Sequence, residues 1–184
     1  AGVLNGSLTV SELKVKSADG VTTNLMFKIS PVDQQTALSN LHVEKLKFRF
    51  QGINIKNVLS KLNMQENVLA SIKGPFVFTG SLSGKLSSMA INTKALFLGG
   101  ECNFSGNIKP YDYSPSISGK FSIRHSNLSD LLPWLGFKNR SKISKNERVV
   151  LSGHLVGIAQ SLNISKVSGN IAGIKLSGNI YTDF

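Results

Sequence analysis

Apolar and polar residues alternate one by one along many short stretches of this chain. In KLSGNI at 175–180, Leu176, Gly178 and Ile180 fall on one face of a strand, and the three polar residues fall on the other. Such alternation is typical of antiparallel sheets with one apolar and one polar face. It predicts strands at these positions: 46–50, 76–86, 91–96, 101–108, 117–124, 149–157, 162–167 and 174–180.

Glycine interrupts the apolar rows of these predicted strands. A tetrad of Ser, Gly, a polar and an apolar residue recurs along the chain, and six glycines stand where the alternation calls for an apolar side chain: Gly80, Gly84, Gly106, Gly153, Gly157 and Gly178. Glycine inside a strand costs conformational entropy, so it usually marks a bend, a bulge or a close approach by another group. We expect these glycines to fold a long sheet lengthwise into a trough, with scattered bulges in an ordinary β-sandwich as the alternative.

The sequence repeats itself at a distance of 73 residues. Over the 47 positions from Phe48 to Lys94, eleven residues are identical to those 73 positions later, whereas composition alone would give roughly three. Each copy also holds a leucine-containing segment, 54–63 or 127–136, that predicts a short helix. We expect one continuous, mainly β structure, an elongated and curved antiparallel groove with one short helix per repeat. It would consist of three parts: the end of a preceding repeat, 1–40, and two repeat units, 41–115 and 116–184.

Composition sets broad limits. The 184 residues are 41% hydrophobic and only 17% charged, so the chain can bury a core and is not typical of a disordered tail. No apolar run approaches the ~18–20 residues that span a bilayer. Because the strand pattern is already under way at Ala1, we expect the sequence to be a segment of a longer protein.

The formal net charge of +11 has two interpretations. A basic stripe would suit nucleic acid or anionic lipid headgroups, whereas the plainer interpretation is that lysine fills solvent-facing positions. The densest basic stretch, 138–148, lacks aromatic residues for base stacking. We expect a solvated loop there, with headgroup contact as the alternative, and we expect no nucleic-acid partner.

No residue pattern in the chain predicts an active site. His42, His125 and His154 show no metal-ligand spacing with one another or with Cys102, and we expect surface or edge positions for all three histidines. The acidic residues are scattered singly, and GSLSG at 80–84 lacks the central serine of a nucleophile elbow. We therefore expect no enzyme activity and no cofactor, and Cys102 should be a small buried apolar side chain.

The apolar rows leave two possibilities open. More than twenty Phe, Leu, Ile and Val residues would face the trough, and covering each would contribute about 1.5–3 kcal/mol. Such a lining would be much larger than the few hundred Å² of apolar patch that soluble monomers normally expose. Either the trough closes as the dry core of a structural or adhesive β-repeat protein, or it holds apolar ligands such as acyl chains.

The order of the sequence blocks resembles the periplasmic region of the AsmA-like family. An amphipathic strand, NLSDLLPWLG, a variable stretch and VVLSGHLVG…LNISKVSGNIAGIKLSGNI follow one another, and the resemblance covers most of 41–184. It implies a curved β-groove of the repeating type shared with bridge-like lipid-transfer proteins. It also implies an inner-membrane anchor outside this sequence, a periplasmic location, and a role in phospholipid transport between the inner and outer membranes or in outer-membrane homeostasis.

On this interpretation, phospholipid acyl chains are the partners of the inward side chains. Basic residues on rims and loops would meet anionic headgroups or keep the trough soluble. The residues expected to contact lipid are Phe48, Phe50, Phe76, Phe78, Leu82, Phe104, Ile108, Phe121, Ile123, Leu151, Leu155, Leu176 and Ile180.

Overall fold

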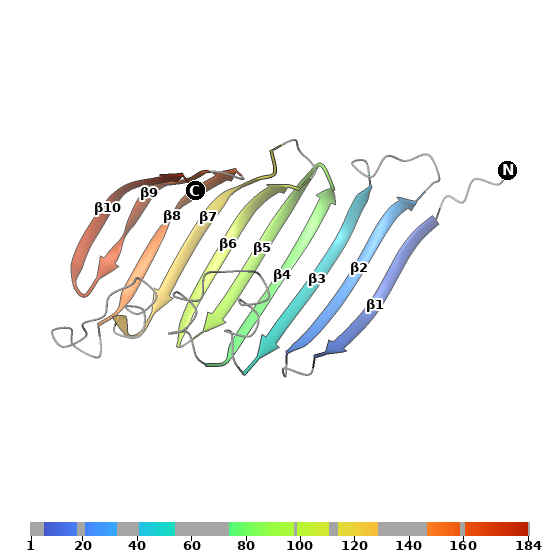
Figure 1. Cartoon of the computed structure of the whole chain (residues 1–184), viewed down its shortest axis with the longest axis horizontal. Helices are drawn as coiled ribbons and strands as arrows, with labels where there is room; N and C mark the ends of the chain where they lie inside the picture. Colours follow the sequence, from blue (N-terminus) through green and yellow to red (C-terminus); the bar gives the residue numbers. More distant parts are fainter. Residues whose placement is uncertain are drawn as a thin grey trace.

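Ten antiparallel strands form one open sheet in the order of the sequence (Figure 1). The computed structural model describes residues 6–17, 21–32, 41–53, 74–97, 99–110, 114–128, 147–158 and 161–183. The strands are β1 (Gly6–Lys16), β2 (Thr22–Val32), β3 (His42–Gly52), β4 (Phe76–Lys85), β5 (Ser88–Phe97), β6 (Gly100–Lys109), β7 (Ser116–His125), β8 (Val149–Ile158), β9 (Ser161–Ile171) and β10 (Ile174–Asp183).

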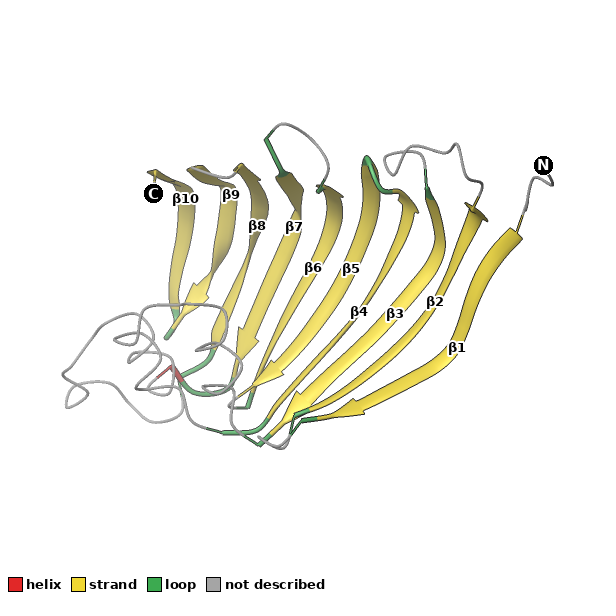
Figure 2. Cartoon of the chain, turned by 45° about the vertical axis from the view of Figure 1, so that its right-hand side comes forward, coloured by secondary structure: helices red, strands yellow, loops and turns green. Residues whose placement is uncertain are grey.

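Each strand pairs with the strand before it, so the sheet is a simple meander. The strands bend along their length, which hollows one side of the sheet (Figure 2). Nine inter-strand spacings of ~4.8 Å make the sheet roughly 43 Å long across its strands. The prediction of a mainly β, antiparallel architecture is confirmed, and the sheet is open rather than closed.

Helix is almost absent from the part of the chain that the structure describes. Only Leu128 is helical there, at the start of the predicted segment 127–136. The rest of that segment, and all of the predicted helix at 54–63, lies outside the described residues. The expected helix in each repeat is therefore not seen.

The 73-residue spacing of the sequence recurs in the strands. β4 and β8 begin and end 73 positions apart, and β5 and β9 begin 73 positions apart. The pairing register agrees as well, because Phe48 lies opposite Gly80 in one copy and Phe121 lies opposite Gly153 in the other. The division of the chain at 41 and 116 stays a prediction.

The hydrophobic core of the described residues is small. Five apolar side chains are buried: Val43, Phe76, Met89, Leu128 and Val149. Leu128 packs on Val149, next to Leu151, Ile171 and Ala172. The backbone amide of Leu128 donates a hydrogen bond to the carbonyl oxygen of Glu147 over 2.8 Å. Most of the apolar face is therefore only half-buried.

Two of the glycines in the apolar rows lie where the pairing register between neighbouring strands shifts. The register of β8 on β9 shifts at Gly153, and that of β10 on β9 shifts after Gly178. The irregularity in β9 places Lys166 at φ 52°, and the side-chain oxygen of Asn179 accepts its amide hydrogen over 2.9 Å. Bulges, the alternative use expected for glycine, thus occur within the curved sheet.

Candidate functional site

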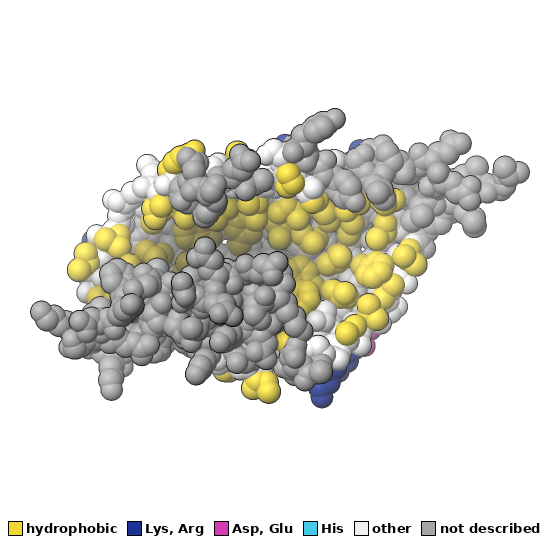
Figure 3. Space-filling view, in the orientation of Figure 1, with side chains coloured by type: hydrophobic (Ala, Val, Ile, Leu, Met, Phe, Trp, Pro, Cys, Tyr) yellow, Lys and Arg dark blue, Asp and Glu magenta, His cyan; other side chains and the backbone are white. Residues whose placement is uncertain are grey.

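All thirteen side chains expected to contact lipid lie on one face of the sheet. Cross-strand pairing aligns Phe50 with Phe78 and Phe104 with Phe121, and the other predicted residues continue the same alternation. We call this side the hollow face. Figure 3 looks onto it and shows hydrophobic side chains gathered in a band that crosses the strands.

The hollow face carries further apolar residues besides these thirteen. The same period-2 alternation in β2, β5, β7 and β9 could have identified them. They include Leu25, Phe27, Ile29, Met89, Ile91, Phe97, Ile117, Leu162 and Ile164, each opposite another hollow-face residue.

Some hollow-face side chains on the two edge strands are more than half exposed. Leu8 is 53% exposed on β1, and Ile180 is 55% exposed on β10. Between the ends, Phe48, Phe78 and Phe104 are half-buried. The described elements therefore leave a continuous apolar surface open.

Three phenylalanines form an aromatic cluster on the floor of the hollow face. The ring centroids of Phe48 and Phe50 are 5.6 Å apart, those of Phe48 and Phe78 are 5.4 Å apart, and those of Phe50 and Phe78 are 6.2 Å apart. Tilted or offset pairs at these distances are favourable beyond the area they bury. The cluster makes a continuous aromatic surface across β3 and β4.

Glycines make room for the rings of their cross-strand neighbours. A Cβ built on Gly153 would lie 2.8 Å from Cε1 and 3.0 Å from Cζ of Phe121. A Cβ on Gly80 would meet Cζ of Phe48 and would lie 2.8 Å from the carbonyl oxygen of Asn92. The apolar row thus has no hole at these glycines, because an aromatic ring from the next strand covers each one.

Two glycines face each other on the floor of the hollow face. Gly106 of β6 lies opposite Gly119 of β7, and a Cβ on Gly106 would lie 2.6 Å from the Cα of Gly119. This glycine pair lies between the Phe104–Phe121 pair and the Ile108–Ile117 pair. The ring of Phe104 reaches over this pair, since a Cβ on Gly119 would lie 2.7 Å from its Cζ.

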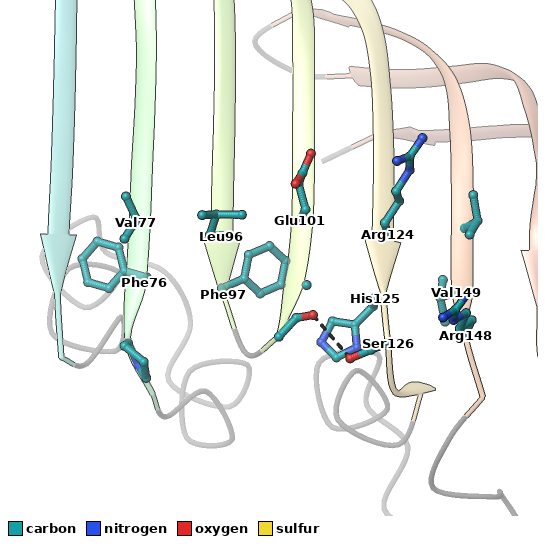
Figure 4. A pocket seen from close by; sticks show the side chains of 14 residues that line it. Phe76, Val77, Leu96, Phe97, Glu101, Arg124, His125, Ser126, Arg148 and Val149 are labelled. Carbon is teal, nitrogen blue, oxygen red and sulfur yellow. Dashed lines mark hydrogen bonds between the residues drawn. The ribbon is translucent and has the colours of Figure 1, made fainter.

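A hollow of about 780 Å³ lies where β4 to β8 meet the loops at one end of the sheet (Figure 4). One cross-strand row from each face of the sheet lines it. The outer-face row consists of Val77, Leu96, Glu101, Arg124 and Val150, and the hollow-face row consists of Phe76, Phe97, Gly100, His125 and Val149. The size of the hollow is in the range of small-molecule sites, ≈300–1,000 Å³.

His125 is the polar member of the hollow-face row that lines this hollow. The residue is 3% exposed, so the expectation of a surface or edge position is wrong for it. Its Nδ1 accepts the amide hydrogen of Asn127 over 3.0 Å, and its Nε2 is buried without a hydrogen-bond partner. Leaving such a group unpaired costs roughly 1–3 kcal/mol. Phe121, Ile123 and His125 occupy alternate positions of β7, so the sequence pattern could have predicted that His125 lies on the hollow face.

Polar residues predominate on the opposite, outer face, which also exposes some apolar side chains such as Leu96 and Val150. Lys28 pairs with Glu44 over 2.6 Å, and Lys94 pairs with Glu101 over 2.8 Å. Hydrogen bonds from Lys28 and then Ser30 lower the pKa of Glu44. Asn103 and then Lys94 lower the pKa of Glu101 in the same way. Ser105 donates to Asn92 over 2.6 Å, so hydroxyl, amide and charged groups keep this face in water.

Cys102 lies on the hollow face, opposite Ile123 and Ala95. It is half-buried, and burial raises the pKa of its thiol above the ordinary 9.0. A raised pKa leaves little thiolate at neutral pH, so this cysteine is a weak nucleophile.

Among the described residues, no group of three or more His, Cys, Asp and Glu side chains could hold a metal ion. The same part of the chain contains no helix with the length and apolar character needed to cross a membrane. Comparisons with models of protein families, with curated proteins and with solved structures found no match to this chain. Membership of the AsmA-like family stays a prediction from the sequence.

Proposed function

We propose that the hollow face binds the acyl chains of lipids. The observation that carries the proposal is the continuous row of half-exposed apolar side chains across an open sheet. Water contact over so large an apolar surface is unfavourable, and covering each large side chain contributes about 1.5–3 kcal/mol. An apolar occupant of low specificity fits this lining, since it offers few polar groups.

The dimensions suit chain-like molecules. One leaflet of a bilayer has a hydrocarbon thickness of about 15 Å, half of the ≈30 Å core. The sheet is roughly 43 Å long across its strands, so acyl chains could lie end to end along it. The floor alternates aromatic rings with glycine, and these offer apolar contact without polar groups that would need partners.

The resemblance to the AsmA-like family extends this proposal to a cellular role. In that role the chain is one segment of a repeating β-groove in an envelope protein anchored in the inner membrane. It contributes to phospholipid transport between the inner and outer membranes or to outer-membrane homeostasis, on the periplasmic side. The segment acts by binding and guiding lipid and performs no chemistry.

Matched substitutions on one strand test the proposal. Phe78→Asp places a charge in the aromatic cluster, whereas Ser83→Asp places the same charge on the exposed outer face of β4. Each variant is incubated with vesicles of phosphatidylglycerol and phosphatidylethanolamine, separated from them, and analysed for bound lipid. We expect Phe78→Asp to lose the bound lipid and Ser83→Asp to keep it. Equal loading of the two variants would contradict the proposal.

Folding of the variants is checked independently. Phe78 packs against Phe48 and Phe50, so its substitution also weakens the sheet. Ile180→Asp is a second variant, since this side chain lies on the hollow face of β10 and is 55% exposed. It should reduce loading while leaving the circular dichroism spectrum and the melting temperature nearly unchanged.

A further inference from the structure

The buried histidine at the end of the hollow face holds a hydrogen atom that has no acceptor. Nδ1 of His125 accepts the amide hydrogen of Asn127, and only a deprotonated nitrogen can do so. The neutral imidazole therefore carries its hydrogen on Nε2. That atom is buried and has no partner among the described residues.

The neighbours of His125 leave its ring beside the hollow. Gly100 lies directly opposite, and a Cβ there would meet Cδ2 of the imidazole, so only glycine allows the ring to lie over this strand. Figure 4 shows the imidazole and the ring of Phe97 on the same side of the sheet, on strands that flank β6. His125 is itself one of the residues that line the hollow, and Nε2, the ring atom next to Cδ2, is the donor that has no partner in the described part of the chain.

The surroundings select the kind of acceptor. Phe76, Phe97 and Val149 make this row apolar, and an anionic oxygen would lose its hydration there. Glu101, Arg124 and Arg148 also line the hollow, but Glu101 and Arg124 alternate to the outer face of the sheet, where they lie opposite each other. An uncharged carbonyl oxygen needs one hydrogen bond and suits a neutral donor among apolar groups.

We infer that Nε2–H of His125 donates to the ester carbonyl of an acyl-chain lipid. The inference rests on the proposed function, because the chain of that lipid occupies the hollow face. The hollow of about 780 Å³ then receives the ester end of the molecule, and the rows beyond it hold the hydrocarbon. The site discriminates ester-linked from ether-linked lipids, which have the same chains but no carbonyl group.

A competition between two lipids tests this inference. The chain is mixed with vesicles of equal amounts of a diester and a diether phosphatidylcholine that carry identical chains, and bound lipid is counted by mass spectrometry. We expect an excess of the ester lipid of about threefold to tenfold, the range of one neutral hydrogen bond. In His125→Phe the ratio should fall to one, because the ester lipid loses its hydrogen bond and then binds no better than the ether lipid. His154→Phe alters a histidine on the outer face of β8 and should keep the wild-type ratio.

The outcomes separate the inference from the proposed function. Equal binding of the two lipids to the wild-type chain overturns the ester site and leaves the apolar groove standing. A preference that survives in His125→Phe overturns the role of this histidine. A wild-type chain that binds neither lipid contradicts the proposed function. If His125→Phe fails to fold, the wild-type ratio alone still decides whether the ester is recognised.

Discussion

The ring of Phe48 lies over Gly80, its direct partner across β3 and β4, and Phe121 lies over Gly153 in the same way 73 residues later. Each pair joins the largest apolar side chain to the smallest residue. The glycines therefore keep the apolar floor continuous by letting a neighbour's ring cover their backbone, an arrangement that also serves to pin register in sheets.

Substituting alanine for a covered glycine should destabilise the sheet. In Gly80→Ala the new methyl group meets the Phe48 ring and the carbonyl oxygen of Asn92, and the backbone atom cannot move aside cheaply. Overpacking of this kind costs about 1–3 kcal/mol in the free energy of unfolding. Urea denaturation measures that cost from the transition midpoint.

Gly178→Ala provides the control. A Cβ at Gly178 meets nothing within 4 Å, and alanine restricts the unfolded chain more than glycine does. We expect this variant to be as stable as the wild type or more stable by up to about 1 kcal/mol. A loss of stability equal to that of Gly80→Ala would show that the ring contact is not the reason for glycine.

The exposed end of the hollow face should matter for binding more than for folding. Leu176 is 42% exposed on β10, so Leu176→Asp should change the free energy of unfolding by less than about 1 kcal/mol. The same variant should lower the amount of bound lipid. Ser177→Asp, one residue along and on the outer face, should leave both quantities near their wild-type values.

Lipid loading should slow the alkylation of Cys102. Its thiol is half-buried on the hollow face and its pKa is raised by burial, so iodoacetamide should react slowly at pH 7.5. An acyl chain over β6 would slow the reaction further, and denaturant should make it fast. Reaction rates that do not differ between the loaded and the lipid-free chain would exclude lipid from this part of the face.

The ion pairs of the outer face should make stability depend on acid pH. The pKa values of Glu44 and Glu101 are lower in the folded chain than the ordinary 4.5. Their ionised forms therefore stabilise the fold above about pH 4.5, and this contribution is lost as the pH falls through the lowered pKa values. Glu101→Gln should show a smaller loss of stability between neutral and acid pH than the wild type. Since both groups are exposed, added salt should reduce the difference.

Eight of the ten strands, β3 to β10, were predicted from the sequence because side chains in a sheet alternate with a period of two, whereas no range was predicted for β1 or β2. The prediction of 46–50 was too short for β3, which spans His42–Gly52. The register shifts between Val43 and Leu46, so two polar residues stand in a row there and the alternation is broken. A bulge hides part of a strand from a pattern that assumes regular pairing.

The role of the glycines and of His125 could not be predicted in the same way. The residue opposite a given glycine depends on the register between strands, which the alternation within one strand does not specify. His125 was expected at the surface from its residue type, although its position in step with Ile123 puts it on the hollow face. Its buried Nε2 becomes evident only once the neighbouring strands and the amide of Asn127 are in place.

The most direct test of the central claim is to identify what the chain carries when it is made in bacteria. The purified protein is extracted with organic solvent, and the extract is analysed by mass spectrometry against a known amount of protein. We predict phospholipid in stoichiometric amounts from the wild-type chain and almost none from Phe78→Asp. A stable wild-type protein that is free of lipid and does not take it up from vesicles would contradict the account, and the apolar rows would then pack as a dry core.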